Sequence, residues 1–130
     1  MKKKIQYADE IWRWFKEQHY FKQIDGKRLE LLNELAKRLG EFYHLNPLPE
    51  VTFVKLFEGN SGLSYADIGH NKIGMVNRLS LLTFIHEFGH LLGLNQREAI
   101  DFSQEIFKVN FPRSFAKLKK IKGDLLVRQN

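Results

Sequence analysis

The sequence contains no cysteine among its 130 residues. This absence excludes a disulfide framework, catalysis by a thiolate and zinc sites built on cysteine ligands. Histidine and carboxylate side chains are therefore the metal ligands that remain. Hydrophobic residues make up 43% of the chain and include 11 phenylalanines, so a hydrophobic core can form without covalent cross-links.

Long apolar runs are also missing. No stretch of about 18 consecutive apolar residues is present, so no membrane-spanning helix is expected. Lysines follow Met1, as in a signal peptide, but Gln6, Asp9 and Glu10 occupy the positions where such a peptide is apolar. We therefore expect a cytoplasmic protein without membrane contact, folded as a single domain over residues 1–130.

Acidic residues are outnumbered by basic ones. The 21 Lys and Arg residues against 15 Asp and Glu residues give a net charge of +6, with the excess concentrated at the two ends of the chain. A basic surface can hold nucleic acid or an acidic protein partner, or it can simply keep the protein soluble. Composition does not choose between these roles, so direct contact with nucleic acid stays open.

Apolar residues at helical spacing predict two N-terminal helices, over 7–23 and 27–44, with Asp25 as the N-cap of the second. Pro47 and Pro49 end this helical part, because proline favours extended geometry in the residue before it. Runs rich in β-branched and aromatic residues predict strands, and turn residues at 69–71 predict an antiparallel hairpin between the last two. The three predicted strands cover 51–57, 63–68 and 72–77.

A helix capped by Asn77 or Ser80 should follow and end at Gly93. A further helix is expected from Asn95 to Val109, and Pro112 should stop it. The sequence thus predicts an α+β fold. Its parts are two helices within 1–45, a small, mostly antiparallel sheet of about three strands within 51–77, two helices within 79–110, and a tail over 111–130 with a short basic helix.

The first of the two later helices carries the string HEFGH at residues 86–90. At about 100° per residue, His86, Glu87 and His90 share one narrow strip of an otherwise apolar helix. Residues four apart lie one above the other, so both imidazoles can reach a zinc ion at about 2.0–2.1 Å, and Glu87 can act as general base on a zinc-bound water. This spacing is typical of zinc hydrolases. The alternative is a buried helix whose histidines hydrogen-bond to the backbone.

A tetrahedral zinc site of this kind needs a third protein ligand. Glu98 is preferred, because Gln96, at the position of the third histidine of metzincins, is a neutral amide, and no methionine follows to make the turn of that family. Asn95 and Glu98 also have the spacing of a capping box, which leaves a structural role for Glu98 open. Asp101 is a candidate to orient a ligating imidazole, or else forms a solvated acidic stripe with Glu98 and Glu105.

Two residues of the predicted hairpin are candidates to contact substrate. The strand over 63–68 can hold an extended peptide along its edge, and Tyr65 or His70 can stabilise an oxyanion. The alternatives are that Tyr65 packs against the fold and that His70 is a solvent-exposed turn residue.

The order of these elements, together with HEFGH and Glu98-Ala99-x-x-Phe102, resembles the ImmA/IrrE metallopeptidases over roughly 35–107. SprT-type and metzincin-like zincins are weaker matches. The resemblance implies Zn²⁺ held by His86, His90 and Glu98, with Glu87 as general base. It also implies a cytoplasmic regulatory protease of narrow specificity, whose substrate is a protein such as a DNA-binding repressor. The alternative is a non-catalytic zincin-fold module that holds a protein or nucleic acid by its basic ends.

Overall fold

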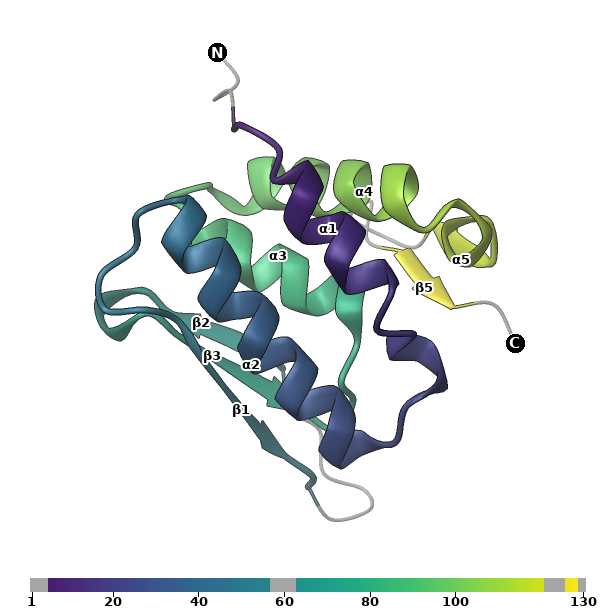
Figure 1. Cartoon of the computed structure of the whole chain (residues 1–130), viewed down its shortest axis with the longest axis horizontal. Coiled ribbons are helices and arrows are strands. Elements are labelled where there is room, and N and C mark those ends of the chain that lie inside the picture. The colour runs from purple at the N-terminus through teal and green to yellow at the C-terminus, as the bar shows by residue number, and fades with distance from the viewer. Residues whose placement is uncertain (1–4, 57–62, 121–125, 129–130) are drawn as a thin grey trace.

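The computed structural model describes residues 5–56, 63–120 and 126–128 and has the predicted α+β fold (Figure 1). The helices are α1 (Asp9–Lys16), α2 (Asp25–Phe42), α3 (Leu81–Leu91), α4 (Gln96–Asn110) and α5 (Pro112–Ala116), with short 3-10 helices η1 (Tyr20–Lys22) and η2 (Ile68–His70). The strands are β1 (Glu50–Val54), β2 (Tyr65–Asp67), β3 (Lys72–Val76), β4 (Leu118–Lys120) and β5 (Leu126–Arg128). No helix in the described ranges is both long and apolar enough to cross a membrane.

The predicted helix over 7–23 is split in two. α1 ends at Lys16, and the exposed His19 then adopts a left-handed backbone with φ of 51° before η1 begins. A residue in that region cannot continue a right-handed helix. The break turns the buried Tyr20 inward, where its hydroxyl donates a hydrogen bond of 2.6 Å to the carbonyl oxygen of Leu79.

An aromatic cluster joins these first helices to the end of α4. The rings of Trp12, Phe15 and Phe21 meet those of Phe107 and Phe111 edge to face, with centroids 5.4–6.5 Å apart. Such pairs stabilise a core by about 0.5–1.5 kcal/mol each beyond the area they bury. The start of the chain is thereby held against α4 (Figure 1).

The larger sheet has the strand order β1-β3-β2 and is mixed rather than mostly antiparallel. The hairpin is antiparallel as predicted, with Tyr65 opposite Gly74, and η2 and Asn71 make its turn. β3 lies in the middle of the sheet, between β2 and β1. It runs parallel to β1, so the sheet has one antiparallel and one parallel pair. β1 ends at Val54, so Lys55 and Leu56 of the predicted strand are irregular. Phe57 and the predicted loop over 58–62 lie outside the described residues.

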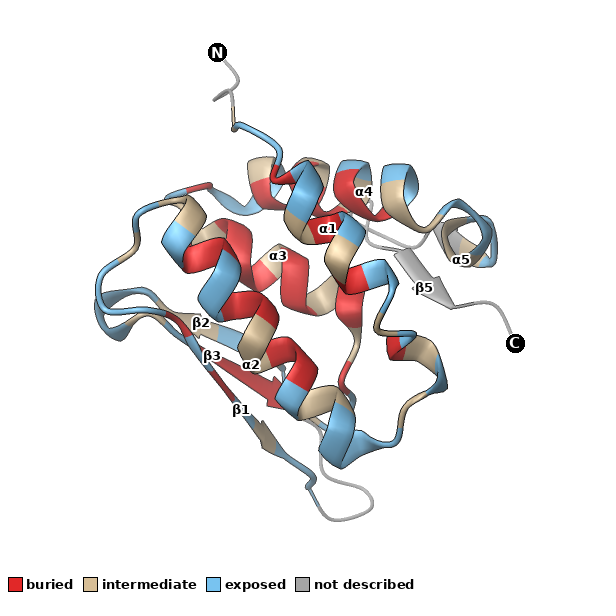
Figure 2. Ribbon diagram, viewed as in Figure 1, coloured by how far each residue is buried: buried red, intermediate tan, exposed pale blue. Residues whose placement is uncertain are grey.

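The core lies between α2, the sheet and α3. α2 contacts β1 and buries one face at helical spacing, and α3 contacts β2, β3 and α4. Figure 2 shows α3 buried along most of its length. The buried residues of α2 are Leu31, Leu32, Leu35, Ala36, Leu39 and Gly40. Asp25 is the first residue of α2 rather than its N-cap, a position taken by Ile24 without a side-chain hydrogen bond.

The end of the chain differs from the predicted basic helix. Pro112 is the first residue of α5. Proline fits this position because the backbone N–H groups in the first turn of a helix have no partner within the helix, so the missing N–H of proline costs no hydrogen bond. α5 has five residues, and β4 and β5 then pair antiparallel. Residues 121–125 lie outside the described part of the chain.

Candidate metal centre

The central helix α3 begins at a clear cap. The hydroxyl of Ser80 accepts a hydrogen bond of 3.2 Å from the backbone N–H of Thr83, so Ser80 is the N-cap of α3. Asn77, the other candidate, has φ of 65° and uses its side-chain oxygen to accept from the N–H of Leu56 at 2.8 Å. The capped helix carries His86, Glu87 and His90.

The turn after α3 brings the next helix back over these residues. Gly93 has φ of 88°, its N–H donates to the carbonyl of His90 at 3.0 Å, and the N–H of Leu94 donates to the carbonyl of Gly89 at 3.1 Å. These are the two hydrogen bonds of a Schellman motif. At Gly89, a Cβ would lie 3.2 Å from the ring of Phe102, so the missing side chain lets α3 and α4 approach closely.

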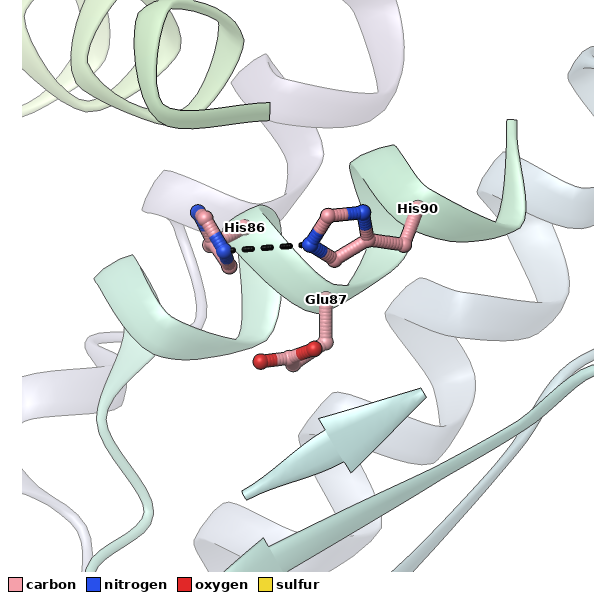
Figure 3. A group of neighbouring side chains, drawn as sticks. All are labelled: His86, Glu87 and His90. Carbon is pink, nitrogen blue, oxygen red and sulfur yellow. Dashed lines mark hydrogen bonds between the residues drawn. The ribbon is translucent and has the colours of Figure 1, made fainter. Parts of the chain in front are cut away.

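Three ligand atoms converge where α4 begins. The Nε2 atoms of His86 and His90 lie 3.2 Å apart, and the Oε1 atom of Gln96 lies 3.1 Å from each of them. Figure 3 shows the two imidazole rings meeting beside α3. The Nδ1 atom of His90 donates to the carbonyl oxygen of Leu94 at 2.9 Å. That bond fixes the ring and leaves the lone pair of its Nε2 facing the cluster.

Glu87 extends from α3 beside the rings (Figure 3) and is buried. One of its oxygens and one nitrogen of each histidine lie within 4.8 Å of one another. Burial raises the pKa of the Glu87 carboxyl above its ordinary value, and the neighbouring His90 acts against that shift. Burial lowers the pKa of His86, the neighbouring His90 lowers it further, and the contact with Gln96 acts in the opposite direction. Burial thus favours the uncharged forms of both the His86 imidazole and the Glu87 carboxyl.

The donor set fits a divalent metal ion. Ligand atoms held by a tetrahedral zinc ion at about 2.0–2.1 Å lie roughly 3.3–3.4 Å apart, and the two histidine nitrogens already lie 3.2 Å apart. Imidazole suits zinc and several transition metals, so the geometry fits a metal site without fixing the metal. The Nδ1 atom of His86 is buried without a hydrogen-bond partner among the described residues.

Two of the predicted site residues lie on another face of α4. The Glu98 carboxylate accepts from the Asn95 N–H at 2.9 Å, and the Asn95 side chain accepts from the Glu98 N–H at 2.8 Å, which completes a capping box. Glu98, predicted as the third ligand, is therefore not brought to the histidines. Asp101, predicted to orient an imidazole, pairs with Arg97 at 3.3 Å and lines a separate cavity with Glu98.

The two hairpin candidates are placed differently from each other. Tyr65 lines the cleft that contains the histidines, and its ring covers Gly74, where an added Cβ would lie 2.3 Å from the ring. His70 is exposed, contacts Asp67 at 3.0 Å and is not among the residues that line the cleft. Of the pair, Tyr65 is the one near the candidate metal centre.

The cleft has a volume of about 630 Å³. Its α4 wall consists of Gln96, Ile100, Ser103 and Gln104. Sequence reasoning considered Gln96 as the less favoured ligand and missed the other three. These positions follow a helical i, i+4, i+7, i+8 pattern, a signal that was present in the sequence. The prediction followed the acidic face of the same helix instead, because Glu98, Asp101 and Glu105 share it.

Comparison with known proteins adds no family to this description. The chain was compared with protein-family models, curated proteins and solved structures, and none of them matches it. The chemical features of the site are the His86-Glu87-His90 group and the cleft that contains it.

Proposed function

We propose that the chain is a zinc-dependent peptidase that hydrolyses peptide bonds in a protein or peptide substrate. The observation that carries this proposal is the group of ligand atoms from His86, Glu87 and His90, which lie within 4.8 Å of one another on the wall of an open cleft. The His-Glu-x-x-His spacing provides two metal ligands and a general base on one helix face.

The proposed chemistry assigns a separate task to each side chain. His86 and His90 would hold the metal, which when bound supplies a Lewis acid that polarises a scissile carbonyl and makes water more acidic. Glu87 would take the proton of the attacking water on a carboxylate oxygen and later give it to the nitrogen of the departing amine. Its position beside both imidazoles supports this role. The hydrogen bond from His90 to Leu94 would keep the imidazole oriented.

The sheet edge supports a peptide as the substrate. β2 pairs with β3 on one side and is an edge strand of the described sheet. Leu63, Tyr65 and Ile68, on or next to β2, are 88%, 55% and 59% exposed and line the cleft of the histidines. An extended peptide could pair with this edge and place a peptide bond beside Glu87. By the resemblance to ImmA/IrrE proteins, the chain would be a cytoplasmic regulatory protease, and the peptide would belong to a protein such as a DNA-binding repressor.

Metal content and cleavage together test the proposal. Elemental analysis of the purified protein should find one zinc per chain, and His90→Ala should lose it. A proteome-derived peptide library incubated with the zinc-loaded protein should yield new termini by mass spectrometry, and Glu87→Gln should abolish them while keeping its zinc.

Two outcomes contradict the proposal. A parent protein that binds no zinc even when zinc is supplied in excess contradicts the metal-dependent proposal. Stoichiometric zinc without cleavage, combined with salt-sensitive binding of a protein or nucleic acid, would favour the non-catalytic binding module.

A further inference from the structure

The side-chain oxygen of Gln96 occupies the place of a third metal ligand. It lies 3.1 Å from the Nε2 atom of His86 and 3.1 Å from that of His90, which are themselves 3.2 Å apart. We propose that Gln96, not Glu98, is the third protein ligand of the metal, through its amide oxygen. This inference rests on the metal-binding part of the proposed function and not on peptide hydrolysis.

The shape of the triangle supports a shared cation. Its three sides are nearly equal and slightly shorter than the roughly 3.3–3.4 Å that separates ligand atoms around tetrahedral zinc. A small expansion would seat an ion against all three atoms. Gln96 is the first residue of α4 and is exposed, so its side chain can make this adjustment without disturbing the core.

Counting protons supports the same conclusion. The Leu94 carbonyl can only accept, so the Nδ1 atom of a neutral His90 carries the ring proton and its Nε2 atom is an acceptor. The amide oxygen of Gln96 is also an acceptor. The Nε2 atom of a neutral His86 carries at most one proton, so the three converging atoms share one hydrogen at most and at least two of them are acceptors. A cation satisfies all three at once.

Glu98 is already engaged in the capping box and lies at another cavity. Its carboxylate accepts from the Asn95 N–H at 2.9 Å, and it lines the cavity that also contains Tyr7, Asp101 and Glu105. To reach the histidines it would have to give up that hydrogen bond and leave this cavity. Gln96 needs neither change, which makes it the better placed of the two.

An amide ligand has a consequence for affinity. His86, His90 and Gln96 together bring no negative charge, so the ion keeps its full charge and is held less tightly than by a site with a carboxylate ligand. Replacing the amide by an isosteric carboxylate should therefore strengthen metal binding. Because these uncharged ligands hold zinc weakly, the fraction of protein that carries zinc should rise with the zinc concentration.

The test measures zinc affinity by competition with a chromogenic chelator at pH 8, and thermal unfolding of the metal-free chain. Gln96→Ala should weaken zinc binding at least about tenfold, since even the partners behind metal ligands are worth roughly 10–100-fold. Gln96→Glu should tighten it, and neither change should alter metal-free stability much. Glu98→Gln keeps a capping-box side chain without the carboxylate and should bind zinc like the parent. Glu98→Ala should lower metal-free stability through loss of the cap, again without loss of affinity.

Visible absorption of the cobalt-loaded protein provides a readout of the ligands themselves. Gln96→His should change the cobalt spectrum, and Glu98→Gln should leave it as in the parent. Parent-like zinc affinity and cobalt spectrum in the Gln96 variants would overturn the assignment of Gln96. A loss of affinity in Glu98→Gln would instead make Glu98 the ligand. In both cases zinc binding by the parent would still support the proposed function, so the two failures are distinguishable.

Discussion

The side chain of Asn33 pairs with both polar backbone groups of Val51. Its oxygen accepts from the Val51 N–H at 2.8 Å, and its amide nitrogen donates to the Val51 carbonyl at 3.0 Å. Val51 is buried in β1, which is the edge strand opposite β2. The side chain of Asn33, from α2, therefore pairs backbone groups that an edge strand would otherwise leave without partners. One helix residue thereby fixes the sheet against α2.

Asn33→Ala should destabilise the protein by about 2 kcal/mol, because a buried N–H and C=O both lose their partner. Urea unfolding followed by circular dichroism measures the difference. Asn33→Asp is the matched variant, since it keeps the acceptor for the N–H but loses the donor, and it should be less destabilised at low pH than at neutral pH. Equal stability of Asn33→Ala and the parent would contradict this account of β1.

Two glycines of α2 should respond oppositely to alanine. A Cβ at Gly40 would lie 2.3 Å from the Cδ atom of Pro49, so Gly40→Ala should cost about 1–3 kcal/mol through overpacking. Gly26 has nothing within 4 Å of its Cβ position, and alanine has the higher helix propensity, so Gly26→Ala should be neutral or stabilise by up to about 1 kcal/mol. Thermal unfolding of the pair checks both signs, and a stabilised Gly40→Ala would show that the loop over 46–49 moves freely.

The turn at Gly93 positions residues of the candidate metal centre. The φ of 88° at Gly93 disfavours a side chain, so Gly93→Ala should cost about 1–2 kcal/mol. The same change should weaken zinc binding, because the turn places both the Leu94 carbonyl and Gln96. Gly93→Asn should lose less, since asparagine tolerates the left-handed region best among the other residues. If Gly93→Ala lowered stability but left zinc affinity unchanged, the turn would not be what positions the zinc-binding residues.

His86 should titrate below its ordinary pKa of 6.5 in the metal-free protein, because burial and the neighbouring His90 lower its pKa. The unfolded chain then takes up this proton at a higher pH than the folded chain. The stability contributed by His86 is therefore present above about pH 6.5 and is lost as the pH falls through the lower pKa of the folded state. Two-dimensional NMR of the ring protons gives the midpoint, and a value at or above 6.5 would contradict the burial of this ring.

Locally encoded features were predictable from sequence. The α+β class is confirmed, and Ser80 caps α3 and Gly93 ends it as the local sequence indicates. The grouping of His86, Glu87 and His90 was also predictable, because their spacing lies within one helix and does not depend on tertiary packing. The metal and the hydrolytic reaction stay predictions.

The remaining features depend on packing between elements. The left-handed residue that splits the first predicted helix is His19, and no glycine at that position indicates a break. The parallel pairing of β1 with β3 depends on the strand order, in which β2 lies at an edge. The rotation of α4 about its axis decides whether Gln96 or Glu98 faces the histidines. That rotation is set by the Gly93 turn and the close approach at Gly89, neither of which a helix pattern alone specifies.

The aromatic cluster has a consequence for biosynthesis. Trp12, Phe15 and Phe21 are made early, but their partners Phe107 and Phe111 leave the ribosome only after the three-stranded sheet, α3 and most of α4. A nascent chain arrested before Phe107 would expose those early rings to solvent or to chaperones. Completion of this aromatic cluster is thus tied to synthesis of the chain as far as Phe111.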